Sequence, residues 1–525
     1  MFKVLIADKL SAKAQRVFAA RGIEAAVKTD LDPAAFAATL ADCDGLAVRS
    51  STHVTADILA GAPKLKVIGR AGIGVDNIDV AAATRRGVVV MNTPHGNSVT
   101  TAEHSLAMMF ALARQIPAAD RSTQAGKWEK NRFMGVELTG KTLGIIGCGN
   151  IGSIVAERAL GLRMKVVGHD PYLAPERART LGIEAVGLDE LLARADFITL
   201  HLPLNDKTRG IIDARALAKT KQGVRLINCA RGGLVVEADL KAGLDSGRVA
   251  GAALDVFAVE PAIANPLFGH PNVVMTPHLG AATHEAQENV AVQVAEQMAD
   301  FLVTGAVSNA VNAPSVTAEE AVRLKPYMAL VAQLGAFLGQ LVEEGIRTVT
   351  LEYRGQVGQL NTRPLTAVAL AHLLAPRLAS VNMVNAPEVA RARGIAVKEI
   401  VEDQDPDYQG SIAMSVSANG CERDIAGTLV GGHRPRLVRV DGIAVEAELG
   451  AHMVYVRNRD MPGVIGRIGT LLGEAGVNIA TFSLGRRSQG GDAMALVGVD
   501  VAPPTAVLDR LGALGEIVQV TPLRF

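Results

Sequence analysis

Three side chains with complementary acid–base chemistry follow three successive apolar runs near the middle of the chain. The runs end near Ile227, Leu254 and Thr276, and the side chains are Arg231, Glu260 and His278. Histidine can take a proton from a hydroxyl group, a carboxylate can fix the tautomer of its ring, and arginine holds a carboxylate substrate bidentately. Because the carboxyl ends of parallel strands meet at one edge of a sheet, the sequence predicts one constellation that oxidises a 2-hydroxy acid by hydride transfer.

A glycine turn upstream supplies the site for the hydride acceptor. Gly147, Gly149 and Gly152 form G-x-G-x-x-G directly after the apolar run 143–146, and helical sequence follows. This order of strand, tight turn and helix binds the pyrophosphate of a dinucleotide. Asp170 ends the next strand, where a carboxylate binds the adenosine ribose and repels a 2′-phosphate. The pattern therefore predicts NAD rather than NADP.

Length and composition bound the remaining possibilities. A chain of 525 residues is long enough for about three or four domains. Lys plus Arg equals Asp plus Glu at 53 each, which gives no reason to expect nucleic acid or an anionic membrane as a partner. The N-terminus lacks the apolar core of a signal peptide, so the cytoplasm is the expected compartment. The scattered cysteines, expected to be buried thiols without a disulfide or a metal site, are Cys43, Cys148, Cys229 and Cys421.

The chain changes its rhythm along its length. Apolar runs at 3–7, 45–48, 67–69 and 87–91, separated by alanine-rich helical sequence, predict a small α/β domain that holds the substrate. Beyond residue 315 no catalytic cluster is visible, and the pattern predicts a helix over 318–342, an exposed strand over 347–353 and a helix over 365–378.

Several segments carry a family resemblance. IIGCGNIG (145–152), NCARGG (228–233), GAALDVFAVEP (251–261) and TPHLGAAT (276–283) resemble the signature segments of the D-isomer-specific 2-hydroxyacid dehydrogenases. GRAGIGVDNID (69–79) and GNSVTTAEH (96–104) look closest to the phosphoglycerate dehydrogenase branch of that family. The resemblance covers about residues 1–312, and the rest resembles the long form of this branch.

The resemblance implies a fold and a division into domains. It implies a Rossmann-type doubly wound cofactor domain (94–280) inserted in a flavodoxin-like α/β substrate domain (1–93 and 281–312). An α+β intervening domain (315–448) and a ferredoxin-like ACT domain (450–525) would follow. The family's catalytic residues would be Arg231, Glu260 and His278; its cofactor residues Gly147, Gly149, Asn150, Ile151, Gly152, Asp170, Cys229 and Asp255; and its substrate residues Arg49, Gly74, Asn97, Ser98 and Arg231.

The ACT-like segment implies regulation by an amino acid. Asn458, Asp460 and Asn478 occupy positions where family members hold L-serine between paired domains, so a homo-oligomer, a dimer or tetramer, is expected. The basic turn at 433–436 is either an anion site or a solvated loop. Lys130 and Arg132 are candidates to reach a neighbouring subunit's substrate.

The resulting interpretation is NAD-dependent oxidation of 3-phosphoglycerate to 3-phosphohydroxypyruvate, the first step of serine synthesis. Two alternatives stay open at this point. One is a hydroxypyruvate or glyoxylate reductase, and the other is an NAD-sensing binding protein similar to the corepressors that use the same fold. Turnover of a panel of 2-hydroxy acids separates the three.

Overall fold

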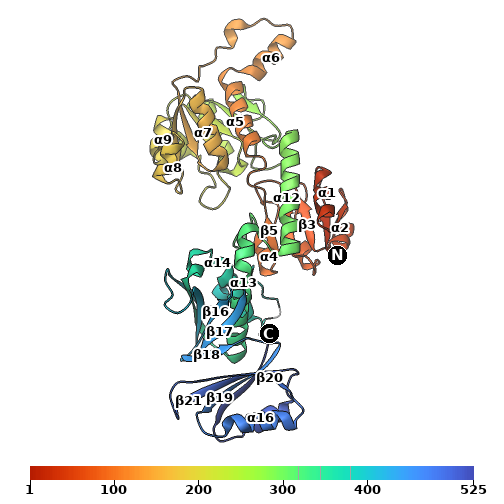
Figure 1. The fold of residues 1–525 in the computed structure, drawn as a ribbon. Coiled ribbons are helices and arrows are strands. Elements are labelled where there is room, and N and C mark those ends of the chain that lie inside the picture. Colours follow the sequence, from red (N-terminus) through yellow and green to blue (C-terminus); the bar gives the residue numbers. More distant parts are fainter. Residues whose placement is uncertain (317, 343, 379) are drawn as a thin grey trace.

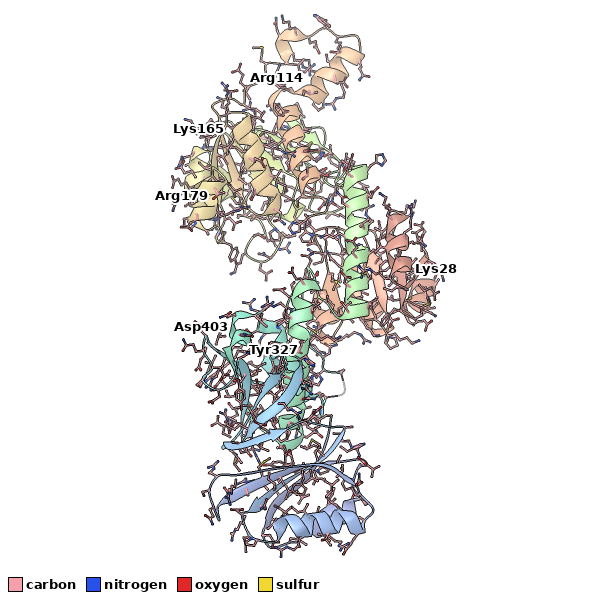
Figure 2. All side chains as sticks on the ribbon, viewed as in Figure 1. Lys28, Arg114, Lys165, Arg179, Tyr327 and Asp403 are labelled. Carbon is pink, nitrogen blue, oxygen red and sulfur yellow. The ribbon has the colours of Figure 1, made fainter. Side chains whose placement is uncertain are left out.

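Four sheets organise an elongated molecule (Figure 1). The computed structural model describes residues 1–316, 318–342, 344–378 and 380–525. The two sheets of the N-terminal half lie at one end and the ACT-like sheet at the other, with the intervening sheet between them. Exposed charged side chains such as Lys28, Lys165 and Arg179 line the periphery of the N-terminal half (Figure 2). Among the described helices, none is both long and apolar enough to cross a membrane.

The first sheet is parallel, in the order β2-β1-β3-β4-β5, which is the flavodoxin-like order. Its strands are β1 (Lys3–Ile6), β2 (Glu24–Val27), β3 (Gly45–Val48), β4 (Val67–Arg70) and β5 (Val89–Met91), and its helices are α1 (Lys13–Ala20), α2 (Pro33–Leu40), α3 (Ala56–Ala60) and α4 (Val80–Arg85). Strand β2 was not among the predicted runs, because an edge strand with the sequence EAAV lacks an apolar signal.

Helix α12 (His284–Thr304) packs on this sheet although it follows the cofactor domain in the chain. Val290, Val294 and Met298 on α12 are buried in one cluster with residues of β1 and β4. A Cβ built on Gly69 of β4 would lie 2.3 Å from the Met298 sulfur, so the helix needs a glycine beneath it. The chain therefore leaves the substrate domain and comes back to complete its core.

The second sheet is also parallel, with seven strands in the order β12-β11-β10-β9-β6-β7-β8. Counted from β6, this is the 3-2-1-4-5-6 order of a dinucleotide-binding fold with one strand added. The strands are β6 (Thr142–Ile146), β7 (Lys165–His169), β8 (Glu184–Ala185), β9 (Phe197–Leu200), β10 (Val224–Asn228), β11 (Val249–Leu254) and β12 (Val273–Met275). The helices are α5 (Ser98–Ala113), α7 (Asn150–Gly161), α8 (Pro175–Thr180), α9 (Leu188–Arg194), α10 (Ala214–Lys219) and α11 (Glu237–Asp245).

A helical excursion projects from this domain at the top of Figure 1. It contains α6 (Ile116–Gln124) and the short 3₁₀ turn Lys130–Arg132. Trp128 is 87% exposed and Met134 is 76% exposed, so two large apolar side chains lie in solvent here.

The intervening sheet is mixed, in the order β14-β13-β15-β16-β17-β18. It contains β13 (Ile346–Gly355), β14 (Ala396–Glu402), β15 (Gly410–Ala418), β16 (Cys421–Val430), β17 (Arg434–Val440) and β18 (Ile443–Ala447), with α13 (Ala318–Leu341), α14 (Arg363–Leu374) and α15 (Ala386–Ala392). The strand predicted over 347–353 is present as β13, but the prediction that it is exposed is wrong. Strand β13 lies between β14 and β15, and its Val349, Leu351 and Tyr353 are fully buried.

The C-terminal sheet is antiparallel, and its order β20-β21-β19-β22 is that of a ferredoxin-like βαββαβ module. Its elements are β19 (His452–Arg459), α16 (Val464–Glu474), β20 (Ile479–Arg486), β21 (Asp492–Val499), α17 (Thr505–Gly512) and β22 (Ile517–Arg524). One face of the sheet packs on α13, where Phe337 contacts Tyr455 edge to face and stacks on Phe525. The last two domains therefore share one hydrophobic core.

A loop of the intervening domain docks on the substrate domain. The Asn382 and Asn385 side-chain amides donate to the carbonyls of Gly87 and Arg85, at 2.9 and 3.2 Å, where α4 ends. Val384 between them is buried in the core cluster of the substrate domain. Of the cysteines, Cys421 is exposed, which corrects the expectation that all four are buried. The predicted α/β fold class is confirmed, with its Rossmann-type, mixed and ACT-like parts.

Candidate active site

The carboxyl edges of the two parallel sheets both carry the predicted functional residues. Strands β10, β11 and β12 pair in register, with Asn228 opposite Leu254 and Leu254 opposite Met275. The segments that follow these strands carry Arg231, Glu260 and His278 on one edge. Polar residues at the carboxyl ends of parallel strands are the usual ligand-binding positions in such sheets.

His278 and Glu260 are hydrogen-bonded to each other. His278 Nδ1 lies 2.6 Å from Glu260 Oε2, and the other carboxylate oxygen accepts the Phe257 N–H at 3.0 Å. Burial raises the pKa of Glu260, but these two hydrogen bonds outweigh it, so its pKa lies below the ordinary value. The ionised carboxylate therefore orients the imidazole through Nδ1, and no hydrogen bond from the described residues engages Nε2. The His278 backbone has a φ of 56°, a left-handed conformation that bulky residues rarely adopt.

Arg231 joins the two domains. Its Nε lies 2.8 Å from Asp76 Oδ2 of the substrate domain, and its Nη1 donates to the Ala230 carbonyl at 2.7 Å. A Cβ built on Gly74 would lie 1.6 Å from Arg231 Nη2, so any larger residue at this position would displace the guanidinium. The predicted substrate residue Gly74 thus lies directly beside the Arg231 guanidinium, and binding of a substrate carboxylate by Arg231 stays a prediction.

Arg49 lies at the carboxyl edge of the first sheet, in the substrate domain. Arg70, which was not among the predicted site residues, lies on the same edge. Arg49 follows β3 and Arg70 ends β4, and the register places Val48 opposite Arg70. Burial, then the positive charges of Arg231 and Arg49, lower the Arg70 pKa to about 10. Burial likewise lowers the Arg49 pKa. The charge of Arg70 is therefore repelled by two further cations, and an anionic ligand would relieve this repulsion.

The loop that presents Arg49 is held from both sides. The Asp8 carboxylate accepts the Arg49 N–H at 2.5 Å and the Thr52 hydroxyl at 2.9 Å. The Asn77 amide donates to the carbonyls of both residues, at 2.7 and 2.6 Å. These contacts fix the backbone at the cleft before any ligand arrives.

The glycine turn has the shape that a pyrophosphate requires. Gly147 has a φ of 96°, and a Cβ there would lie 2.4 Å from the His201 carbonyl oxygen. A Cβ on Gly152 would lie 2.0 Å from the Gly147 carbonyl oxygen, so α7 packs directly on the turn. A Cβ on Gly149 would meet nothing within 4 Å, which leaves open space at the N-terminus of α7. These observations fit a dinucleotide at this turn.

The remaining predicted cofactor residues near this turn differ in their contacts. Asp170 follows β7, and its two oxygens accept the N–H groups of Cys148 and Tyr172, each at 2.9 Å. Asn150 begins α7 and donates to the Pro94 carbonyl at 3.3 Å, whereas Ile151 is partly buried beside the core. A ribose role for Asp170 stays a prediction.

Asp255 and Cys229 are both buried in the structure. Asp255 has no exposed surface and accepts the N–H groups of Leu279 and Gly280, at 2.7 and 2.8 Å. Burial raises the Cys229 pKa to about 12, with a further increase from Asp255, so the thiol stays protonated. Contact of either residue with the cofactor stays a prediction, and the visible role of Asp255 is to hold the backbone after His278.

Asn97 and Ser98 lie in the crossing between the domains. Ser98 starts α5 and donates to the Pro94 carbonyl at 2.9 Å. Asn97 is 8% exposed, and its side-chain oxygen has no hydrogen-bond partner among the described residues. An unpaired buried oxygen costs free energy unless a ligand or water satisfies it. This observation supports a ligand contact at Asn97.

The three predicted effector residues are each occupied locally. Asn458 is 6% exposed and donates to the Arg459 carbonyl at 2.7 Å. Asp460 accepts Arg486 and the Gly490 N–H, each at 3.0 Å, and Asn478 donates to Asp500 at 2.7 Å. The basic turn is also partly engaged, because Arg436 lies on β17 and pairs with Glu448 at 2.9 Å.

Three residues of the site, Arg70, Asp76 and His104, were not among the predicted site residues. Arg70 ends an apolar run beside the one that precedes Arg49, so the rule that selected Arg49 also selects Arg70. Asp76 and His104 lie within the family-like segments 69–79 and 96–104, but the sequence does not reveal their contacts, because their partners are 155 positions away, at Arg231, and 151 positions away, at Asp255.

Models of three domain families match the chain. Residues 106–280 match the D-isomer specific 2-hydroxyacid dehydrogenase NAD binding domain, 323–441 match the D-3-phosphoglycerate dehydrogenase intervening domain, and 452–516 match the ACT domain. The family model thus agrees with the prediction of NAD as the cofactor.

Known proteins resemble the chain over its whole length. D-3-phosphoglycerate dehydrogenase of Bacillus subtilis (strain 168) is 41% identical over 99% of both chains, and that of Methanocaldococcus jannaschii is 40% identical over 99% of both. Among solved structures, a glyoxylate reductase from Paecilomyes thermophila has a TM-score of 0.55 at 30% identity. It covers 59% of this chain and 98% of its own. Taken with the site geometry, these similarities show that the chain belongs to the D-3-phosphoglycerate dehydrogenase family of the D-isomer-specific 2-hydroxyacid dehydrogenases.

Proposed function

We propose that the protein oxidises 3-phosphoglycerate to 3-phosphohydroxypyruvate with NAD and thereby starts serine synthesis. The observation that carries the proposal is the proximity of Arg49 and Arg231 to Arg70, together with the His278–Glu260 pair on the same sheet edge as Arg231. The substrate has a carboxylate and a phosphate on either side of its hydroxyl group, so a cleft with several cations suits both ends.

The chain's own residues supply the proton transfer and the binding. Bound NAD supplies the hydride acceptor. His278 takes the hydroxyl proton at Nε2, because Nδ1 is engaged by Glu260 at 2.6 Å. The ionised Glu260 stabilises the imidazolium that results. Arg231 binds the substrate carboxylate and polarises the carbonyl oxygen as it forms.

The phosphate is assigned to the substrate-domain edge. Arg49 and Arg70 leave the ends of adjacent strands there, whereas Arg231 comes from the opposite edge and already binds Asp76. Binding of substrate between the edges would draw the two domains together about the crossings at 92–98 and 281. This closure would also exclude water from the hydride path.

A panel of substrates tests this function with the full-length protein. NADH formation is measured with 3-phosphoglycerate, D-glycerate and D-lactate, and NADH consumption with hydroxypyruvate and glyoxylate. We expect the highest kcat/KM for 3-phosphoglycerate. A preference for hydroxypyruvate or glyoxylate would favour a reductase, and NAD binding without turnover of any substrate would favour a corepressor-like protein.

Removal of one phosphate cation sharpens the test. Arg49→Ala should lower kcat/KM for 3-phosphoglycerate about 10- to 100-fold, since a hydrogen bond to a charged group contributes about 1.5–3 kcal/mol. The loss with D-glycerate should be much smaller. Arg16→Ala, at an exposed position of α1 in the same domain, is the matched control. Equal losses on both substrates would remove Arg49 from the phosphate site.

The finer regulatory features are part of the same proposal. We infer that L-serine binds near Asn458, Asp460 and Asn478 between paired ACT domains, and that the protein is a cytoplasmic homo-oligomer, a dimer or tetramer. Support comes from the ACT-domain match and from the exposed edge strand β22, whose Val518 is 58% exposed. Light scattering gives the oligomeric state, and calorimetry with L-serine and other amino acids tests the effector.

A further inference from the structure

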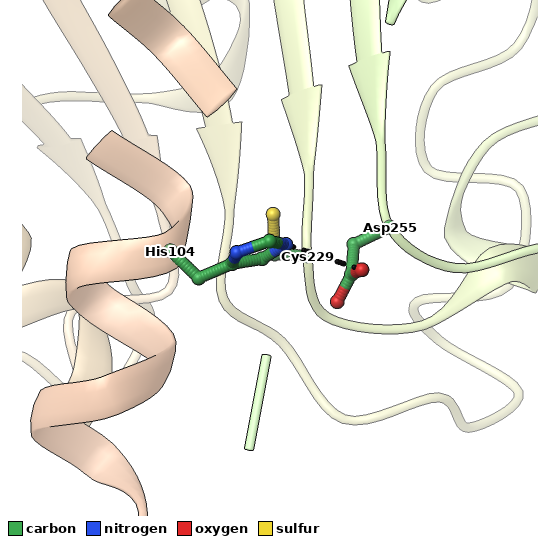
Figure 3. A group of neighbouring side chains, drawn as sticks. All are labelled: His104, Cys229 and Asp255. Atoms are coloured by element: carbon green, nitrogen blue, oxygen red, sulfur yellow. Dashed lines mark ion pairs between the residues drawn. The ribbon is translucent and has the colours of Figure 1, made fainter. Parts of the chain in front are cut away.

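A largely buried polar cluster contacts the loop His278–Gly280 after β12, which carries the catalytic histidine and is called the catalytic loop below. His104 of α5, Cys229 after β10 and Asp255 after β11 offer three side-chain atoms within 4.8 Å of one another (Figure 3). His104 Nε2 lies 3.2 Å from Asp255 Oδ1 and 3.2 Å from the Thr276 hydroxyl. No part of the hydride or proton transfer described above uses His104.

The hydrogen bonds of Thr276 and Asp255 determine which ring nitrogen of His104 carries the proton. Thr276 Oγ1 lies 2.6 Å from Asp255 Oδ1, so the hydroxyl hydrogen points to the carboxylate and the hydroxyl oxygen can only accept from His104. An ionised carboxylate also accepts only. His104 must therefore carry its proton on Nε2 and donate to Thr276 and Asp255.

Asp255 transmits this contact to the catalytic loop. Its Oδ1 also accepts the Leu279 N–H at 2.7 Å, its Oδ2 accepts the Gly280 N–H at 2.8 Å, and its carbonyl accepts the His278 N–H at 2.9 Å. Three successive amides after β12 thus bond to one buried residue. These bonds hold the left-handed backbone that presents the His278 ring to Glu260.

Helix α5 also holds the loop at a second point, one turn earlier. The Thr101 hydroxyl lies 2.9 Å from the Gly280 carbonyl and 3.0 Å from the Asn97 carbonyl. Thr101 and His104 are three positions apart and therefore share a face of the helix. The same helix begins at Ser98, directly after the crossing between the domains.

We propose that His104 is a positioning residue of the dehydrogenase reaction. It donates from Nε2 to Asp255 and Thr276, and through Asp255 it fixes the loop that carries His278. The proposal rests on the dehydrogenase function proposed above, but it adds a residue that touches neither substrate nor the reacting atoms.

A metal site is the rival role for this cluster. Its oxygen atoms are already occupied, since Asp255 accepts four donors, and the protonated Cys229 thiol lies beside Ser105. A divalent cation would have to displace these hydrogen bonds and remove the thiol proton. Hydrogen bonding therefore accounts for the arrangement better than metal binding does.

Paired substitutions in the full-length protein test the proposal. His104→Leu removes the donor, whereas His104→Gln keeps an N–H group on a side chain of similar reach. We expect His104→Leu to lower kcat about 10- to 100-fold, with the KM values for NAD and substrate within about twofold of the original. His104→Gln should restore most of kcat. Glu103→Gln is the control, because Glu103 is the neighbouring exposed residue and pairs with Arg158.

Two further readouts separate positioning from general destabilisation. In His104→Leu the amides of Leu279 and Gly280 should exchange with solvent at least about tenfold faster, while the core amides of β10 stay protected. The acid limb of the kcat/KM profile should also move, because the loosened loop presents His278 less well to Glu260. The charged and titratable groups that face His104 are Asp255 and Cys229.

Each possible outcome decides the question. Unchanged kcat in His104→Leu, equal losses in His104→Leu and His104→Gln, or unchanged amide exchange would overturn the positioning role. Loss of wild-type activity on dialysis against EDTA, with one metal ion per chain before dialysis, would assign the cluster to a metal instead. Assays use whichever 2-hydroxy acid the wild type oxidises, so failure of 3-phosphoglycerate as substrate would not affect the comparison.

Discussion

The active-site edge and the ACT-domain effector site were both predicted from motifs, but only the first is assembled within one chain. At the active site, residues from different strands contact one another, with His278 and Glu260 2.6 Å apart and Arg231 and Asp76 2.8 Å apart. At the effector site, no hydrogen bond among the described residues joins any two of Asn458, Asp460 and Asn478. Each of the three is held by its own neighbours.

The difference follows from sheet geometry. Parallel strands bring their carboxyl ends to one edge, so residues far apart in the sequence converge there without another subunit. An antiparallel ACT-like sheet alternates the direction of its strands, so it has no single carboxyl edge, and the pairing of ACT domains proposed above would cover its exposed edge strand β22. We therefore expect substitutions at the active site to act in the isolated chain and those at the effector site to act only in the assembled oligomer.

The largest effect should come from His278→Ala. Without the proton acceptor, kcat should fall about 10²- to 10⁴-fold, while NADH binding stays near normal because the ring does not hold the glycine turn. Turnover and NADH fluorescence titration measure the two quantities. Glu260→Gln should retain part of the activity. Near-normal turnover of His278→Ala would refute the assigned mechanism.

A single methyl group should be almost as damaging at Gly74. Gly74→Ala places a Cβ 1.6 Å from the present position of Arg231 Nη2, so the guanidinium must move. We expect kcat/KM to fall about 10- to 100-fold, mainly through the substrate KM. Gly187→Ala is the control, since its Cβ would meet nothing within 4 Å. If both variants behave alike, Gly74 does not shape the carboxylate site.

Asp170→Ala should change cofactor choice more than rate. Loss of the carboxylate weakens NAD binding and removes the repulsion of a 2′-phosphate, so the ratio of kcat/KM for NAD over NADP should fall about tenfold or more. Both cofactors are assayed at saturating substrate. An unchanged ratio would exclude Asp170 from the ribose site.

Acid should weaken the catalytic pair through Glu260. The pKa of Glu260 in the folded protein lies below its ordinary value of 4.5. Its stabilising contribution is therefore fully present above pH 4.5 and is lost as pH falls through the lower folded pKa. Reversible loss of kcat/KM in this range is expected from stopped-flow pH jumps. Glu260→Gln should lack this component, and an identical acid profile for both proteins would contradict the assignment.

The smallest change in basal activity should come from Asn478→Ala. This side chain is exposed and bonds to Asp500, so turnover without serine should stay within about twofold, whereas the inhibitory serine concentration rises. Substitution is preferable to deletion after residue 450, because Tyr455 and Phe525 pack on Phe337 of α13. Inhibition by another amino acid but not by serine would change the effector and keep the fold.

The sequence predicts well the strands that are buried on both faces. It does not predict features that depend on residues far away in the chain. The parallel strands read as continuous apolar runs because both of their faces are covered. The edge strands β2 and β8 lack a continuous apolar run and were therefore not predicted. The alternating polar and apolar residues of β13 suggested a solvent-exposed strand, but α14 covers one of its faces. In the site, Arg231, Glu260 and His278 could be predicted because each follows a strand. The contacts of Asp76 with Arg231 and of His104 with Asp255 could not, because they depend on how segments far apart in the sequence pack together.

The loop that docks beside α4 limits how this enzyme can be divided. Val384 fills part of the substrate-domain core, and burial of such a side chain contributes about 1.5–3 kcal/mol. Removal of the chain after about residue 312 would leave a cavity where Val384 lies. It would also leave the carbonyls of Arg85 and Gly87 without the donors of Asn385 and Asn382. The C-terminal half thus contributes to the core of the substrate domain, and a shortened enzyme that ends near residue 312 would need a redesigned surface at the end of α4.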